Sequence, residues 1–98
     1  LAFLFFFALS IMFTLRHFNH PAYVENGQPT RYFRERFALT ERECEIIGEA
    51  IRGQTNQQIA DKLFISPRTV ESHLYSIFQK VGVKNRVQLA NLMQTNAQ

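Results

Sequence analysis

Residues 55–82, TNQQIADKLFISPRTVESHLYSIFQKVG, decide the fold of this chain. Thr55 stands three residues before Gln58, which is the spacing of a capping box at the start of a helix. Ser66 stands directly before Pro67, and a serine cap followed by proline marks a second helix start. The stretch therefore predicts two helices that follow each other closely.

The second of these helices has one apolar side. Its apolar residues recur at helical spacing, and Gly82 ends the pattern: they are Val70, Leu74, Ile77, Phe78 and Val81. We expect a short helix from about Asn56 to Phe64, a turn of about three residues, and a longer helix at about 67–81. This order is typical of a helix-turn-helix unit.

Two further helices flank this unit. Thr40 and Glu43 have the spacing of another capping box, and Asn85 stands three residues before Gln88 at the start of the last apolar stretch. Strand patterns are absent from this part of the chain. Residues 39–95 are therefore predicted to form an all-α domain of four helices.

The polar side of the 67–81 helix is rich in hydrogen-bonding groups of modest length. A merely solvated face more often carries pairs of glutamate and lysine. Donors and acceptors on the first turns of a helix suit contact with base edges in the major groove of DNA. The residues on this side are Arg68, Thr69, Glu71, Ser72, Tyr75, Ser76, Gln79 and Lys80.

The distribution of charge agrees with this hypothesis. The whole chain of 98 residues has a formal net charge of +3, which permits an anionic partner without requiring one. Residues 39–65 carry three basic and five acidic side chains, whereas residues 66–98 carry four basic and one acidic. The half with the 67–81 helix is thus the basic half, which suits contact with phosphates.

Residues 1–15, LAFLFFFALSIMFTL, carry no charge and include five phenylalanines. A helix of this length rises only about 22 Å, less than the about 30 Å of a bilayer core. Because the sequence begins with Leu1 and not with Met, we expect the upstream part of a membrane span to be missing, so that residues 1–15 are the end of a transmembrane helix. A signal peptide and a core helix of a larger soluble domain are the alternatives.

Residues 16–38 are predicted to be a juxtamembrane linker, with a turn at Asn26–Gly27. Arginine is in excess beside the apolar segment, which marks the cytoplasmic side of a membrane. We therefore expect the protein in the cytoplasmic membrane, with residues 16–98 in the cytoplasm. The segment 31–37, RYFRERF, either lies on an anionic lipid surface or forms a short helix that packs on the following domain.

Residues 39–92 resemble the LuxR-type, or GerE-type, helix-turn-helix domain of bacterial transcription regulators. The matching positions include Leu39-Thr40, Arg42-Glu43, Gly53, Asn56, Ile59-Ala60, Leu63, Ile65-Ser66, Thr69-Val70, His73, Lys80, Gly82-Val83, Asn85-Arg86 and Leu89-Ala90. The resemblance implies that the third helix of the domain enters the major groove of double-stranded DNA. It also implies that the fourth helix, at about 86–95, joins two copies into a homodimer.

The resemblance also implies roles for individual residues. By position, the side chains that face the bases are Glu71, Ser72 and Tyr75. The side chains expected at or near phosphates are Asn56, Arg68, Thr69, Lys80, Lys84 and Arg86. Members of the family often have a basic residue where this chain has Glu71, so the DNA sequence bound by a relative does not transfer to this chain.

We expect a membrane-tethered, sequence-specific regulator of transcription. The alternative is a membrane-bound module that binds another protein, which the near-neutral charge of the domain favours slightly. No nucleophile–base pair, carboxylate dyad or glycine-rich phosphate loop is visible, so we expect no enzymatic activity, no cofactor and no metal site. The single cysteine, Cys44, excludes a disulfide framework and is expected to be a small buried apolar residue.

Overall fold

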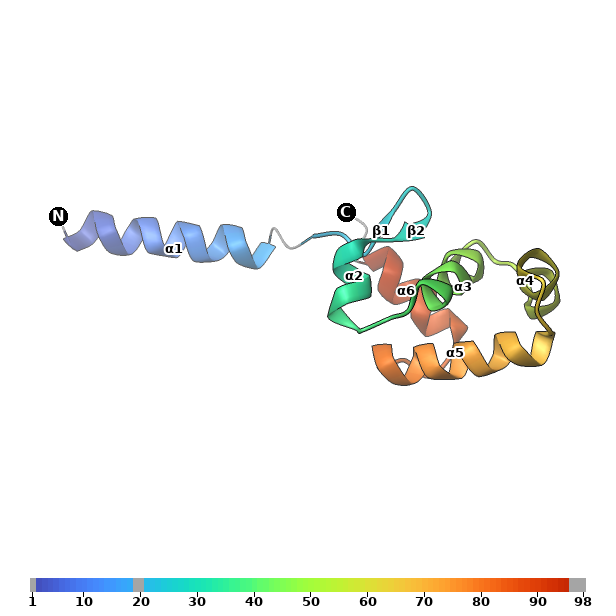
Figure 1. Cartoon of the computed structure of the whole chain (residues 1–98). Coiled ribbons are helices and arrows are strands. Elements are labelled where there is room, and N and C mark those ends of the chain that lie inside the picture. The colour runs from blue at the N-terminus through green and yellow to red at the C-terminus, as the bar shows by residue number, and fades with distance from the viewer. Residues whose placement is uncertain (1, 19–20, 96–98) are drawn as a thin grey trace.

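A computed structural model of the chain describes residues 2–18 and 21–95. Leu1 of the predicted membrane segment, residues 19–20 of the predicted linker and residues 96–98 lie outside the described part. In chain order the elements are α1 (Ala2–Phe18), β1 (Val24–Glu25), β2 (Gln28–Pro29), α2 (Arg31–Arg36), α3 (Glu41–Ile51), α4 (Asn56–Leu63), α5 (Pro67–Val81) and α6 (Arg86–Thr95) (Figure 1). The prediction of a helical fold is confirmed, and the four predicted helices of the domain are α3 to α6.

The helix starts depend on the capping residues that the sequence indicated. Thr40 accepts a hydrogen bond from the Glu43 N–H while the Glu43 side chain accepts one from the Thr40 N–H, which is a complete capping box. Thr55 and Gln58 form a second complete capping box at the start of α4. Each box gives a side-chain acceptor to two backbone N–H groups that would otherwise lack a partner at a helix start.

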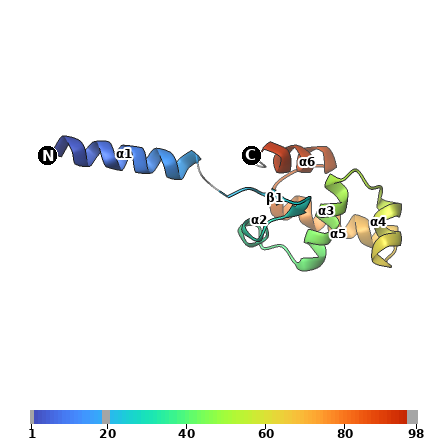
Figure 2. The same ribbon diagram turned by 90° about the horizontal axis from the view of Figure 1, so that it is seen from above.

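The hydrophobic core lies where α3 meets α5 and α6. Ile46 and Ile47 of α3 are completely buried, as are Ile77 of α5 and Leu89 of α6. Ile59 completes this core from α4. Because α3 contributes to the core along its length, α4, α5 and α6 all pack against it (Figure 2).

Residues 21–38 are part of this folded unit. Asn26 and Gly27 both have positive φ angles and form the turn of a two-stranded hairpin, where the sequence indicated a turn. Tyr23 before the hairpin and Phe33 of α2 are buried in the same core as the four-helix domain. Of the two hypotheses for residues 31–37, the short helix packed on the following domain agrees with this geometry.

A buried carboxylate joins the hairpin to the helix-turn-helix unit. One oxygen of Glu49, in α3, accepts hydrogen bonds at 2.7 Å from both Arg52 and Lys62. Arg52 also donates to the carbonyl oxygen of Gly27 at the hairpin turn, and Lys62 belongs to α4. The pairing of Glu49 with two cations offsets the cost of burying its charge and ties the three elements together.

Helix α1 stands apart from the other helices in both ribbon views (Figures 1 and 2). It has 17 residues, which corresponds to a rise of about 25 Å. Among the described residues, no helix combines the length and the apolar character needed to cross a membrane. The predicted location in the cytoplasmic membrane is therefore wrong, and the predicted membrane contact of residues 1–15 is without support.

Candidate nucleic-acid interface

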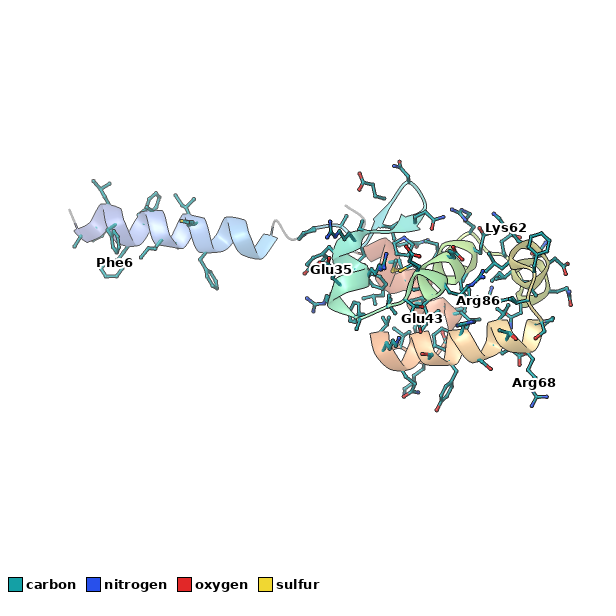
Figure 3. All side chains as sticks on the ribbon, in the orientation of Figure 1. Phe6, Glu35, Glu43, Lys62, Arg68 and Arg86 are labelled. Atoms are coloured by element: carbon teal, nitrogen blue, oxygen red, sulfur yellow. The ribbon has the colours of Figure 1, made fainter. Side chains whose placement is uncertain are left out.

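Helix α5 buries one side and leaves the other uncovered. Its side chains at Val70, Leu74, Ile77 and Val81 point into the core and are buried. The opposite side, which we call the outer face of α5, consists of exposed residues: Arg68, Glu71, Ser72, Tyr75 and Gln79. Figure 3 shows Arg68 projecting away from the body of the domain. The outer face is therefore available to a partner without any rearrangement of the helices.

The start of α5 is held in place by local hydrogen bonds. Ser66 accepts a hydrogen bond from the Thr69 N–H at 3.1 Å, and its hydroxyl lies 2.8 Å from the Thr69 hydroxyl. Pro67 occupies the first turn, where its missing N–H leaves no bond unmade. These contacts fix the direction of the first turn of α5, which is the end that carries Arg68.

The three residues predicted to face the bases lie together on the outer face. Glu71 and Ser72 are adjacent in the sequence, and Tyr75 lies one turn further along the helix. Tyr75 is 67% exposed although its ring is large and apolar. Among the described residues, the Glu71 carboxylate has neither an ion pair nor a hydrogen-bond partner, so it remains free to accept a hydrogen bond.

The residues predicted to contact phosphates do not form one group. Arg68 at the first turn of α5 and Lys84 just beyond its last turn are both exposed. Thr69 is partly buried, and its hydroxyl contacts that of Ser66. Arg68 and Lys84 therefore present positive charge near the two ends of α5, at opposite ends of the outer face.

Lys80 has a partner inside the domain. Its ammonium group donates a hydrogen bond to the Glu43 carboxylate at a distance of 2.7 Å, and the side chain of Glu43 is 4% exposed. Ser76 donates to the other oxygen of the same carboxylate at 2.9 Å. Figure 3 shows Glu43 between α3 and α5. Lys80 and Ser76 thus neutralise and solvate a buried charge, and they lie on the side of α5 that faces α3.

These contacts determine the protonation state of Glu43. Burial raises the pKa of its carboxyl group, but the hydrogen bonds from Lys80, from the Thr40 N–H and from Ser76 together outweigh burial. The pKa of Glu43 consequently lies below the ordinary value of a glutamate. The carboxylate is therefore charged at neutral pH and holds α5 against α3 as an ion pair.

Arg86 and Asn56 contact each other. The Arg86 guanidinium, at the start of α6, donates hydrogen bonds to the Asn56 side-chain oxygen and to the carbonyl oxygen of Gln54. Both Asn56 and Arg86 are partly buried. Two of the predicted phosphate contacts thus join the start of α4 to the start of α6.

Comparison with known families decides the identity of the domain. Residues 38–93 match the family described as bacterial regulatory proteins, luxR family. This match covers more than half of the chain. The chain belongs to the luxR family of bacterial regulatory proteins. The resemblance inferred from the sequence is confirmed, and the domain is a LuxR-type helix-turn-helix domain.

Individual relatives are transcription regulators. The CsgBAC operon transcriptional regulatory protein of Escherichia coli is 47% identical over 58 residues, which are 59% of this chain and 27% of that protein. The transcriptional regulatory protein ComA of Bacillus subtilis is 47% identical over 55 residues, which are 56% of this chain and 26% of that protein. The chain thus matches about a quarter of the length of these relatives.

One relative is matched over most of its length. The spore germination protein GerE of Bacillus subtilis is 41% identical over 56 residues, which are 57% of this chain and 76% of GerE. The matched segments in these three relatives have about the length of the LuxR-type domain itself. The similarity therefore concerns the helix-turn-helix domain, and the membership of this family does not favour the alternative of a module that binds only other proteins.

The contacts of Glu43 with α5 are one feature of the LuxR-type domain that the sequence did not indicate. The capping box at Thr40 and Glu43 was visible from spacing alone, and it is present. The second role of Glu43, as the acceptor for Lys80 and Ser76, joins residues 37 and 33 positions apart in the sequence. The signal that could have indicated it is the position of Ser76 and Lys80, which lie one turn apart on α5, beside its apolar stripe.

Proposed function

We propose that the LuxR-type domain of this chain regulates transcription by binding double-stranded DNA in a sequence-specific manner, with α5 in the major groove. The observation that carries this proposal is the uncovered outer face of α5. Its residues offer hydrogen-bond donors and acceptors near the helix start, where helix-turn-helix proteins contact bases. The family membership of the domain and the names of its relatives support the same function.

The residues of the outer face have distinct proposed roles. Glu71 accepts a hydrogen bond from the amino group of a cytosine, because an ionised carboxylate has no donor to offer a base. Ser72 and Tyr75 complete the base contacts with hydroxyl groups that either donate or accept. Arg68 and Lys84 contact phosphates on either side of the groove, together with the Thr69 hydroxyl. These backbone contacts position α5 without selecting a sequence.

We revise the predicted phosphate contacts at three positions. Lys80 serves Glu43, and Asn56 and Arg86 serve each other, so their charges and polar groups already have partners in the domain. Each of these side chains is thereby held against the domain, and a phosphate contact would be limited to the donors that these bonds leave over. We therefore propose that these three residues position α4, α5 and α6, and that their contribution to DNA binding is indirect.

Helix α6 is the proposed contact between two copies of the chain. Val87 is 67% exposed on this helix, whereas Leu89 and Met93 on its other side are buried in the core. An exposed valine at the start of a packed helix is a suitable apolar contact for a second copy. Two copies joined in this way would bind two half-sites about 10 base pairs apart.

The function is tested by selection of DNA duplexes from a randomised library with the full chain, followed by titration of the selected duplex at several salt concentrations. We expect affinity to fall steeply with salt, because bound phosphates release counterions. Ser72→Ala and Tyr75→Ala should each change the preference at one base pair by about 1–3 kcal/mol.

The matched control is Glu25→Ala in the hairpin, an exposed position on another part of the domain. It should leave both affinity and base preference unchanged. The proposal is wrong if the chain shows no salt-dependent binding to any duplex. Losses that are the same for every sequence in both α5 variants would contradict the proposed base contacts.

A further inference from the structure

Three large apolar side chains are exposed in the part of the structure that spans residues 21–94. They are Phe64, Tyr75 and Val87, with exposed fractions of 95%, 67% and 67%. Tyr75 lies among the proposed base contacts and Val87 on the proposed contact between copies. Phe64 is the most exposed of the three, and nothing proposed so far gives it a role.

The backbone at Phe64 is unfavourable for this residue. Phe64 ends α4 in the left-handed conformation, with φ 59° and ψ 42°. The equivalent position at the end of α5 is Gly82, which has no side chain to disfavour that conformation. A phenylalanine at Phe64 therefore costs conformational free energy that a glycine would not cost.

Packing does not offset this cost. A side chain that is 95% exposed removes almost no apolar surface from water when the chain folds. Neither the backbone nor the core of the domain thus accounts for phenylalanine at this position. An aromatic ring that stabilises nothing in the free domain has its apolar surface available for a partner.

The position of Phe64 indicates which partner it meets. Phe64 comes two residues before Ser66, the cap of α5, and four residues before Arg68 on the outer face. Its N–H donates to the carbonyl oxygen of Ala60, and the Ile65 N–H donates to the same oxygen at 3.0 Å. The turn is therefore held firmly at the end of α5 that is proposed to meet the bases.

We propose that Phe64 contacts the C5-methyl group of a thymine in the major groove, beside the bases contacted by α5. This inference rests on the proposed function of the domain as a sequence-specific DNA-binding unit. The thymine methyl is the apolar group on the major-groove edges of the base pairs, and phenylalanine is a side chain that contacts it. The contact makes Phe64 a specificity residue, because it favours thymine at one position of each half-site.

The test uses Phe64→Gly in the full chain, with the selected duplex as the probe. Glycine removes the ring and suits the left-handed backbone, so the midpoint of thermal unfolding should stay equal to that of the natural chain or rise. Affinity for the selected duplex should fall about threefold to tenfold. A structural role of Phe64 would lower both the midpoint of thermal unfolding and the affinity for DNA. A DNA contact lowers the affinity alone.

A second measurement locates the contact. Each thymine of the selected duplex is replaced in turn by deoxyuridine, which lacks only the methyl group. The natural chain should lose affinity at one position of each half-site where Phe64→Gly shows no loss. Tyr75→Ala is the matched control and should keep its sensitivity at that position, since the Tyr75 ring lies on α5 and not at the turn that carries Phe64. A second variant, Phe64→Asn, removes the same ring and also tolerates the left-handed backbone, so it should give the same result as Phe64→Gly.

The outcomes distinguish the inference from the function on which it rests. If the natural chain binds the duplex and Phe64→Gly binds it equally well, the inference is wrong and the proposed function stands. A loss of affinity without any deoxyuridine position that depends on Phe64 also overturns the thymine contact. If the natural chain binds no duplex, the proposed function itself fails. Unchanged DNA binding with loss of a protein partner would assign Phe64 to a protein contact instead.

Discussion

The ammonium group of Lys80 lies 2.7 Å from a carboxylate oxygen of Glu43, and the side chain of Glu43 is almost completely buried. The same carboxylate caps the start of α3 by accepting a hydrogen bond from the Thr40 N–H. One side chain therefore fixes both the start of α3 and the rotation of α5 about its own axis. Because the outer face of α5 lies opposite the core, this rotation determines which side chains a DNA duplex would meet.

Glu43→Gln should destabilise the domain at neutral pH by about 1–3 kcal/mol. Glutamine keeps an acceptor for the Thr40 N–H but removes the negative charge that pairs with Lys80. Denaturant unfolding measured by circular dichroism gives the difference in free energy. Glu45→Gln is the matched control, because Glu45 pairs with Arg42 on the surface of the same helix and should contribute little. Equal effects of the two variants would contradict the importance of the buried pair.

The stabilising effect of Glu43 should depend on pH in a defined direction. Its pKa in the folded domain lies below the value in the unfolded chain, so its contribution is fully present above the unfolded value of about 4.3. The contribution is lost as the pH falls below that value and through the folded pKa. Unfolding curves of the natural chain and of Glu43→Gln should therefore converge in this acidic range. A difference that stays constant from pH 7 down to pH 3 would be inconsistent with the assigned pKa.

Replacement of Lys80 by alanine should mainly lower stability, whereas replacement of Lys84 by alanine should mainly weaken the salt dependence of DNA binding. Lys80→Ala leaves the buried Glu43 without its cation, so we expect a loss of stability and a small change in the salt dependence of DNA binding. Lys84→Ala removes an exposed charge, so stability should stay unchanged while the slope of log affinity against log salt falls by about 1. Thermal unfolding and a salt titration of both variants check this pair. If Lys80→Ala lowers the slope of log affinity against log salt as much as Lys84→Ala does, Lys80 contacts a phosphate.

The local features of the domain could be predicted from the sequence, whereas contacts between distant residues could not. The capping boxes at Thr40 and Thr55 depend on residues three positions apart, so spacing alone reveals them. The pairing of Arg86 with Asn56 depends on how α4 and α6 are placed around α3, which a single sequence does not show. For this reason the sequence did not indicate that Asn56, Lys80 and Arg86, predicted at phosphates, also make contacts between helices.

The folded unit extends further toward the N-terminus than the sequence predicts, for a similar reason. Residues 16–38 contain proline, glycine and arginine, a composition that favours a linker. Phe33 is nevertheless completely buried, because α2 turns it toward Tyr23 and Phe37, whose ring centres lie 5.0 and 4.9 Å from its own. A helix of six residues is too short to show a periodic apolar pattern, so the sequence did not indicate this contact.

Phe33→Ala should destabilise the whole domain by about 3–5 kcal/mol, because it leaves a cavity among buried aromatic rings. The matched control is Phe5→Ala in α1, where the side chain is 64% exposed and its removal should have little effect on unfolding. Denaturant unfolding followed in the far ultraviolet measures both. If Phe33→Ala unfolds at the same denaturant concentration as the natural chain, residues 21–38 are not part of the cooperative unit.

Val87→Glu should shift the chain from dimer to monomer while leaving the fold intact. Val87 is exposed on α6, so a charged side chain is solvated in the monomer but would be buried in the proposed contact between copies. Sedimentation velocity over a range of protein concentrations measures the shift. Affinity should fall much more for a duplex with two half-sites than for a duplex with one, since only the former engages both copies. Gln57→Glu in α4 adds the same charge at another exposed position and should leave assembly unchanged. A natural chain that remains monomeric on a two-site duplex would exclude α6 as the contact.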